Sequence, residues 1–291
     1  MTTPIAELQD VTRRFGTVRA LDGVSISIAP GEVVAVLGPN GAGKTTAVDV
    51  LLGALTPTTG QARLFGGDPH RLGARRRIGS TPQELGFPST LTARELLGLV
   101  RAHYPRPLAV QDVIVRFGLE EIADRHVGGL SLGQRRRIAI AFAFIGRPDA
   151  VFLDEPTTGL DVAMRRHVWD DIRGYVRDGG TLFLTTHHIE EAEALATRVA
   201  VLNAGRIVFD GAVEALKGRT GVKKVRIRVP VPAGSGAIDA RSTENGVTTL
   251  TTHDPDRLVK DLLDQGLTFG DLEVTSLSLE DAVLELTGGP R

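Results

Sequence analysis

A glycine-rich segment with one lysine forms the first candidate site. Residues 38 to 45 have the sequence Gly-Pro-Asn-Gly-Ala-Gly-Lys-Thr, which fits the pattern G-x-x-x-x-G-K-[ST]. In this pattern the glycines let backbone N–H groups turn toward phosphate oxygens, while Lys44 reaches the β and γ phosphates and the Thr45 hydroxyl suits Mg²⁺. The segment therefore predicts a phosphate-binding loop and not merely a glycine-rich turn.

Two adjacent carboxylates, Asp154 and Glu155, follow a short apolar run over residues 150–153. Ligands of open α/β sheets bind at the carboxyl ends of the strands, where this pair is predicted to lie. Phosphoryl transfer needs a carboxylate that holds Mg²⁺ and a group that orients and deprotonates water. We assign the first role to Asp154 and the second to Glu155, although the pair alone is also compatible with a helix cap before Pro156.

The elements around these residues follow an alternating pattern. Apolar runs at 32–37, 150–153 and 181–186, each bounded by turn residues, are typical of buried parallel strands. The segment after the phosphate loop has helical spacing from Val48 to Leu55 and stops at Pro57. Strand, loop and helix in this order predict an α/β fold with a mainly parallel sheet.

Two further regions complete the predicted organisation. Residues from about 84 to 146 show helical signals and little strand, starting with Thr92 and Glu95 at capping-box spacing, so we expect an inserted helical subdomain. A boundary near Gly221 separates residues 1–221 from a small α+β domain over 222–291. About 70 residues is small for an independent core, so we expect this second domain to make docking or dimer contacts.

Composition narrows the function classes. The 291 residues are 42% apolar and 24% charged, which is typical of a globular protein. The absence of cysteine excludes disulfides, thiolate metal sites and cysteine nucleophiles. A net charge of −1 argues against a broad nucleic-acid footprint. No run approaches the ~18 apolar residues of a spanning helix, and we expect no secretory signal.

Residues 5 to about 216, which include these motifs, resemble the ATP-binding-cassette (ABC) ATPases, a class of phosphate-loop NTPases. Five further segments appear in that family's order: Phe15-Gly16 ahead of Ala20-Leu21, Thr81-Pro82-Gln83, Leu130-Ser131-Leu132-Gly133-Gln134, Gly159-Leu160-Asp161, and His187. The resemblance implies ATP and Mg²⁺ as cofactors and an ATPase activity. It implies catalytic roles for Glu155, His187 and Gln83, and Mg²⁺ contacts for Thr45, Gln83 and Asp154.

The resemblance also fixes an expected set of nucleotide contacts. These are Phe15, Gly38, Pro39, Asn40, Gly41, Ala42, Gly43, Lys44, Thr45, Thr46, Ser131, Gly133, Gln134 and Asp161. Ser131 and Gln134 also have capping-box spacing, and an exposed, capped helix N-terminus suits a γ-phosphate presented by a second subunit. The family most often has glycine where this chain has Leu132, so we expect that side chain to point away from the nucleotide.

Three of these features have plainer alternatives. His187 and His188 resemble a metal pair, but neighbouring residues at a strand end point to opposite sides. Phe15 is also compatible with a core position. The arginine runs 75–77 and 135–137 favour solvated or partner-facing helix charge over nucleic-acid patches.

The process that ATP hydrolysis drives is predicted from resemblance alone. Residues 92–96 and the segment 278–288 resemble daunorubicin- and bacitracin-resistance exporters, which implies a subunit that lies in the cytoplasm on the inner face of the membrane. It implies a separate membrane permease, a second nucleotide-binding subunit in a homodimer, and export of a drug, antibiotic or lipid-like molecule. The alternatives are an ATPase acting on nucleic acid or ribosomes, and a non-hydrolysing nucleotide switch.

Overall fold

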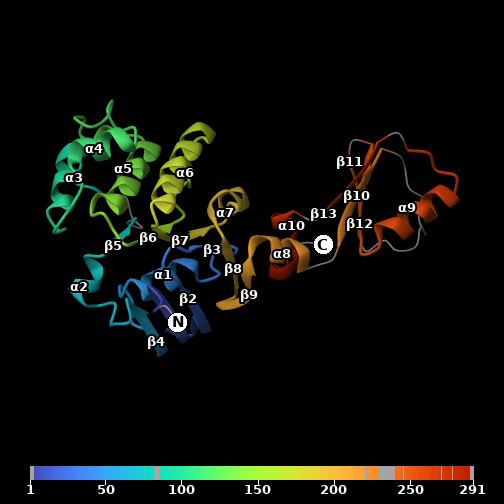
Figure 1. Cartoon of the computed structure of the whole chain (residues 1–291), viewed down its shortest axis with the longest axis horizontal. Helices are drawn as coiled ribbons and strands as arrows, with labels where there is room; N and C mark the ends of the chain where they lie inside the picture. The colour runs from blue at the N-terminus through green and yellow to red at the C-terminus, as the bar shows by residue number, and fades with distance from the viewer. Residues whose placement is uncertain are drawn as a thin grey trace. The chain divides into compact units, whose positions relative to one another are not determined.

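The computed structural model describes residues 3–81, 86–219, 222–228, 240–244, 246–269, 271–276 and 278–288. It divides the chain into two units, Met1–Gly211 and Ala212–Arg291, which are described separately below. Figure 1 labels the helices and strands of both. The predicted site residues all belong to the first unit.

A six-stranded sheet forms the centre of the first unit. Its order is β5-β6-β7-β3-β8-β9, and the first five of these strands pair in parallel. The strands are β3 (Val33–Leu37), β5 (Ile78–Ser80), β6 (Ala150–Asp154), β7 (Thr181–Thr186), β8 (Arg198–Asn203) and β9 (Arg206–Ala212). Every residue of β3 and β7 is buried, as expected for parallel strands covered on both faces, and the prediction of a mainly parallel sheet is confirmed.

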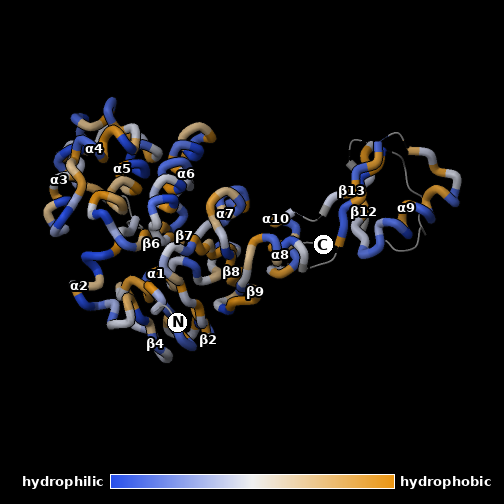
Figure 2. The backbone as a smooth tube through the Cα atoms, viewed as in Figure 1, coloured by the Kyte–Doolittle hydropathy of each residue, from blue (hydrophilic) through white to orange (hydrophobic). Residues whose placement is uncertain are grey.

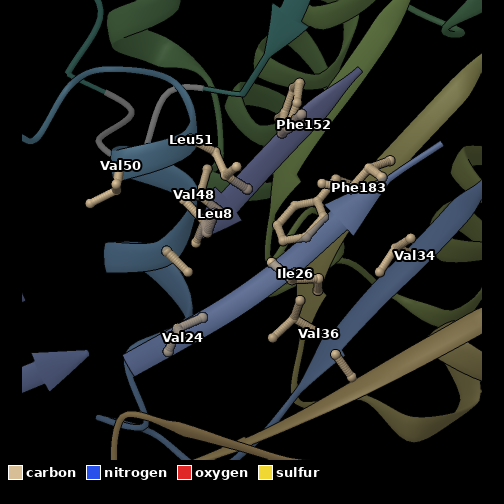
Figure 3. Packing of buried hydrophobic residues seen from close by; sticks show 14 of the residues in the cluster. Leu8, Val24, Ile26, Val34, Val36, Val48, Val50, Leu51, Phe152 and Phe183 are labelled. Atoms are coloured by element: carbon tan, nitrogen blue, oxygen red, sulfur yellow. The ribbon is translucent and has the colours of Figure 1, made fainter. Parts of the chain in front are cut away.

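A second, antiparallel sheet has the order β2-β1-β4. Its strands are β1 (Ala6–Phe15), β2 (Val18–Ile28) and β4 (Thr59–Leu64). Between the two sheets lies α1 (Lys44–Leu51), whose Val48 and Leu51 join Leu8, Phe152 and Phe183 in one buried cluster (Figure 3). This packing fixes α1, and with it the phosphate loop, against the ends of β6 and β7.

Helix α1 ends earlier than the apolar spacing predicted. The pattern extended to Leu55, but the helix stops at Leu51, and the N–H groups of Ala54 and Leu55 both donate to the carbonyl oxygen of Asp49. The chain thus turns before Pro57 rather than at it.

The inserted helical segment holds α3 (Ala93–Arg101), α4 (Val110–Arg116), the 3₁₀ turn η1 (Val127–Gly129) and α5 (Leu132–Ile145), after a short α2 (Leu72–Arg75). Both predicted capping boxes are present, Thr92 with Glu95 on α3 and Ser131 with Gln134 on α5. The second half of α5, from Ile138 onward, is buried on all sides. Two further helices follow along the chain, α6 (Val162–Arg177) and α7 (Ile189–Leu195).

The second unit is an antiparallel sheet with helices, ordered β11-β12-β10-β13. Its elements are α8 (Val213–Arg219), β10 (Lys223–Ile227), β11 (Ala240–Glu244), β12 (Val247–Thr252), α9 (Pro255–Asp264), β13 (Leu272–Ser276) and α10 (Leu279–Thr287). Helix α9 carries hydrophobic and hydrophilic turns (Figure 2), and its Leu258 and Leu262 pack on Val225 and Leu250. Strand β11 was not anticipated.

The predicted boundary at Gly221 falls outside the described residues. Helix α8, which precedes it, packs against α10, so the second unit starts at Ala212. The functional division between the two parts stays a prediction. In the part of the chain that the structure describes, no helix is long and apolar enough to cross a membrane.

Candidate nucleotide-binding site

The phosphate loop connects β3 to α1 and is shaped by its glycines. A Cβ atom on Gly43, whose φ is +106°, would lie 2.4 Å from the carbonyl oxygen of Ala20. A Cβ atom on Gly38 would lie 2.2 Å from the carbonyl oxygen of Leu202. Only glycine fits such close backbone approaches, so β2 and β8 together hold the loop in place.

The amino end of α1 is open toward the loop. Gly43 stands at the cap position, no side chain caps the helix, and its first turn holds no acidic residue. Uncapped N–H groups at a helix start carry partial positive charge and bind anions. The loop therefore fits a phosphate group, as predicted from the sequence.

Lys44, at the start of α1, is almost fully buried. Its Nζ donates to the carbonyl oxygens of Gly38 at 2.8 Å and Pro39 at 3.2 Å, and it lies 3.4 Å from Oε1 of Glu155. The ammonium group is thus held at the mouth of the loop and beside one of the two predicted carboxylates.

Asp154 lies at the end of β6, and its carboxylate accepts hydrogen bonds from two hydroxyl groups. The Oγ1 atom of Thr45 donates to its Oδ2 atom at 2.8 Å, and the Oγ1 atom of Thr185 donates to its Oδ1 atom. Parallel pairing of β6 with β7 places Thr185 directly opposite Asp154. The backbone N–H of Asp154 donates to the hydroxyl of Thr81, so both the carboxylate and the backbone of this residue are held by hydrogen bonds.

Glu155, the next residue, has an uncommon φ of +47°. Its N–H donates to the backbone and side-chain oxygens of Thr185, at 3.0 and 3.2 Å. Its Oε2 atom lies 3.1 Å from Nδ1 of His187 and accepts from the Thr158 hydroxyl at 3.3 Å. The local backbone turn thus aims the carboxylate at both Lys44 and His187.

The balance of these contacts lowers the pKa of Glu155. Burial raises that pKa, but the hydrogen bond and charge of His187, followed by those of Lys44, lower it further than burial raises it. The carboxylate is therefore ionised at neutral pH and able to accept a proton.

Residues of the phosphate loop and the two carboxylates line a cavity of about 370 Å³, which we call the phosphate cavity. Its walls are formed by Ala20, Asn40, Gly41, Gly43, Lys44, Thr45, Thr46, Arg136, Asp154 and Glu155. Most of the predicted phosphate-loop contacts are therefore brought together with the predicted carboxylates. Arg136 and Thr81 belong to segments named from the sequence but were given no part in this cavity, and Thr185 was not singled out, although its place near the end of a predicted strand, two residues before His187, was a usable signal.

The residues present fit a magnesium ion. Among the described residues, no group of three histidine, cysteine or acidic side chains converges on one point. The Thr45 hydroxyl and Asp154 carboxylate do meet at the cavity wall. Mg²⁺ is typically held by one or two protein oxygens together with phosphate oxygens and water, so this donor set suits it.

Residues 131–134 and 159–161, from two of the segments that carry the family resemblance, line a different cavity of about 490 Å³, which we call the signature cavity. Its walls are Ser131, Leu132, Gly133, Gln134, Arg137, Gly159, Leu160, Asp161 and Met164, and no residue is shared with the phosphate cavity. Asp161 caps α6 through the N–H of Met164 at 2.8 Å. Leu132 is 57% exposed. One chain thus does not bring its signature residues to its own phosphate loop.

Phe15 and His187 line neither cavity, although His187 contacts Glu155. Phe15 is exposed at the end of β1, with the guanidinium of Arg13 over its ring at 4.6 Å, and it does not line the phosphate cavity. Gln83 lies outside the described residues, so its predicted role is neither supported nor opposed. His188 stacks on His187 with ring centroids 4.1 Å apart.

Comparison with known proteins gives consistent similarities. A family model described as ABC transporter matches residues 21–158. The daunorubicin resistance ATP-binding protein DrrA3 of Streptomyces coeruleorubidus is 37% identical over 96% of this chain and 94% of its own length. The Nod factor export ATP-binding protein I of Burkholderia lata is 36% identical over 98% of each chain.

Solved structures resemble about 71% of the chain. The ATP-binding cassette MJ0796 in a dimeric, post-hydrolysis state bound to ADP and Pi has a TM-score of 0.66 and 26% identity, covering 71% of this chain and 98% of its own. A second dimeric structure of MJ0796, described as a bacterial ABC transporter cassette, has a TM-score of 0.65 and 25% identity.

Proposed function

The chain belongs to the ATP-binding proteins of ABC transporters, which are Mg²⁺-dependent ATPases, and from this premise we propose that it drives export through a separate membrane permease. Relatives with daunorubicin resistance and Nod factor export in their names support export over action on nucleic acid or ribosomes. Both align over at least 94% of each chain, so the similarity includes the second unit. The proposed cargo is a drug, antibiotic or lipid-like molecule.

One observation carries the hydrolytic part of the proposal. Asp154 and Glu155, adjacent in sequence, contact different partners, Thr45 on one side and both Lys44 and His187 on the other. Asp154 and Thr45 hold Mg²⁺, while Lys44 and the loop N–H groups bind the phosphates of ATP. When bound, the metal neutralises charge that develops on the phosphate oxygens.

Glu155 then acts as the general base. Its ionised carboxylate accepts a proton from the attacking water while the water oxygen forms a bond to the γ phosphorus. The bond between the γ phosphorus and the oxygen that bridges to the β phosphate breaks, which leaves ADP and phosphate. His187, 39% exposed and 3.1 Å from this carboxylate, orients it and lies ready to contact the γ phosphate. We propose that Gln83 contacts Mg²⁺ and the attacking water. Phe15 is proposed to contact the adenine ring.

A second copy of the chain completes the site in this proposal. Because the signature cavity is separate from the phosphate cavity, Ser131, Gly133, Gln134 and Asp161 of a second copy are proposed to cover the ATP held by the first. The capped N-terminus of α5 favours this contact with a phosphate. We place the pair of subunits in the cytoplasm, on the inner face of the membrane beside the permease.

The substitution Glu155→Gln tests hydrolysis. It removes the base while it keeps size and polarity, so turnover is expected to fall by roughly 10²- to 10⁴-fold. ATP binding is expected to persist. A dimer should therefore accumulate in the presence of ATP and be detectable by analytical ultracentrifugation. Unchanged turnover would instead contradict the assignment of Glu155 as the general base, whereas an absence of turnover in the unsubstituted chain would support the non-hydrolysing switch.

Stimulation of the ATPase tests the partner. Membrane vesicles that hold the cognate permease are expected to change the ATPase rate, whereas vesicles without it, DNA and ribosomes are expected to leave that rate unchanged. Stimulation by DNA or ribosomes alone would overturn the export proposal and leave the ATPase assignment intact.

A further inference from the structure

Arg136 is the part of the phosphate cavity that comes from the inserted helical segment. The other lining residues belong to the strands and loops around the two sheets, or to α1. Arg136 lies on α5, five residues after the helix cap Ser131. The sequence analysis favoured solvent or a partner for the arginine run 135–137, and the structure corrects this for Arg136.

The spacing of α5 explains why neighbouring arginines differ. Successive residues of an α-helix are about 100° apart, so Arg136 points roughly opposite to Gln134, two residues before it. Arg137 lines the signature cavity and donates to the carbonyl oxygen of Gly118 at 2.7 Å. The first turns of α5 therefore face two cavities, and Arg136 lines the phosphate cavity of its own chain.

The charges in the cavity require a further cation. Asp154 and Glu155 contribute two negative charges and the triphosphate of ATP adds about four, which exceeds the two positive charges of Mg²⁺ and the one of Lys44. Lys44 is already within 3.4 Å of Glu155 and bonded to two carbonyl oxygens. Without another positive group, repulsion between the carboxylates and the phosphates would weaken binding.

Arg136 is placed to supply that charge. Burial lowers its pKa, whereas the nearby negative charges of Asp154 and Glu155 act to raise it. No ion pair or side-chain hydrogen bond joins its guanidinium to another residue in the ranges that the structure covers. Among the described residues, the guanidinium N–H donors therefore have no protein partner, and their planar arrangement matches phosphate oxygens.

Taking the proposed function as given, we infer that Arg136 is a further ATP-binding residue, which contacts the polyphosphate of ATP held by its own chain. Because the same helix presents Ser131 and Gln134 in the signature cavity, this contact ties ATP occupancy in one chain to the orientation of the surface it offers to a second copy. ATP bound in the first chain thereby prepares α5 for the dimer.

Binding measurements with EDTA, so that no hydrolysis occurs, test the contact. Competition of ATP and of AMP against a fluorescent nucleotide is measured for the unsubstituted chain, Arg136→Gln, Arg136→Lys and the control Arg135→Gln, which lines neither cavity. Arg136→Gln is expected to weaken ATP binding about tenfold and AMP binding less than twofold, because AMP lacks the β and γ phosphates. Arg136→Lys should retain part of the affinity, and Arg135→Gln all of it.

Three outcomes separate the possibilities. Equal weakening of ATP and AMP, or a loss shared by Arg135→Gln, would show a structural role and overturn the inference. An ATP affinity of Arg136→Gln within twofold of the unsubstituted chain would also overturn it, with the proposed function intact. A failure of the unsubstituted chain to bind ATP both with EDTA and with Mg²⁺ would instead contradict the proposed function itself.

Discussion

The phosphate cavity and the signature cavity of the first unit differ in how far one chain completes them. Around the phosphate cavity, Lys44, Asp154 and Glu155 are all bonded to neighbours from other elements. At the signature cavity, Ser131 and Asp161 make their side-chain bonds to the backbone of the helix that each one starts. The first arrangement holds the proposed catalytic groups in place before ATP binds, whereas the second presents a preformed surface for a partner outside the chain.

This difference has a physical cause. Parallel strands bring side chains from distant parts of the sequence to one edge of a sheet, where they satisfy one another. A helix N-terminus is stabilised locally by its own cap, so it keeps its shape without tertiary partners. Substitutions in the first cavity should therefore affect chemistry within one chain, and substitutions in the second should affect association.

Replacing Thr185 with Val tests the first half of this comparison and should have the largest effect. The Thr185 hydroxyl donates to Asp154 and accepts from the N–H of Glu155, so its loss displaces both carboxylates. We expect turnover to fall about tenfold and the free energy of unfolding to fall by about 1–3 kcal/mol. ATP hydrolysis and denaturant unfolding measure the two effects.

A matched control lies on the same strand. Thr181 is also buried on β7, and its hydroxyl accepts from the N–H of Gly31 at 2.9 Å, at the end of the strand away from the carboxylates. Thr181→Val is expected to lose similar stability with unchanged turnover. If both variants lose turnover equally, Thr185 acts only through stability.

Replacing Ser131 with Ala tests the second half, with a smaller effect. Loss of the cap should lower the free energy of unfolding by about 1 kcal/mol. In the Glu155→Gln background, we expect the ATP-dependent dimer to weaken several-fold, while ATP binding by the monomer stays unchanged. Sedimentation velocity at several protein concentrations gives the dimer affinity.

Thr92 supplies the control for Ser131. It caps α3 in the same type of capping box and lines neither cavity. Thr92→Ala should cost similar stability and leave the dimer intact. A dimer weakened equally by both variants would mean that the signature helix has no special part in association.

The smallest effect is expected for Leu132→Gly, which sharpens the comparison. Leu132 is 57% exposed at the start of α5, with Ser131 and Gln134 already capping the helix around it. Because its side chain supports no part of the cap, the dimer affinity should change by less than about threefold, and the free energy of unfolding should fall by up to about 1 kcal/mol. A dimer at least tenfold tighter would show that Leu132 obstructs the contact.

Features that depend on neighbouring residues could be predicted from the sequence. The phosphate loop, both capping boxes and the buried parallel strands each need only a few consecutive residues, and each was found as predicted. The end of α1 was missed because the apolar spacing continues to Leu55 after the backbone has turned at Asp49.

The amino-acid sequence by itself determined the family, and it predicted the phosphate loop and the two carboxylates. Only the tertiary structure decided that Thr185 stands opposite Asp154, that Arg136 faces the phosphate cavity while Arg137 faces the signature cavity, and that these cavities share no residue. Strand register and helix rotation set these relationships, because they depend on packing between segments far apart in the chain.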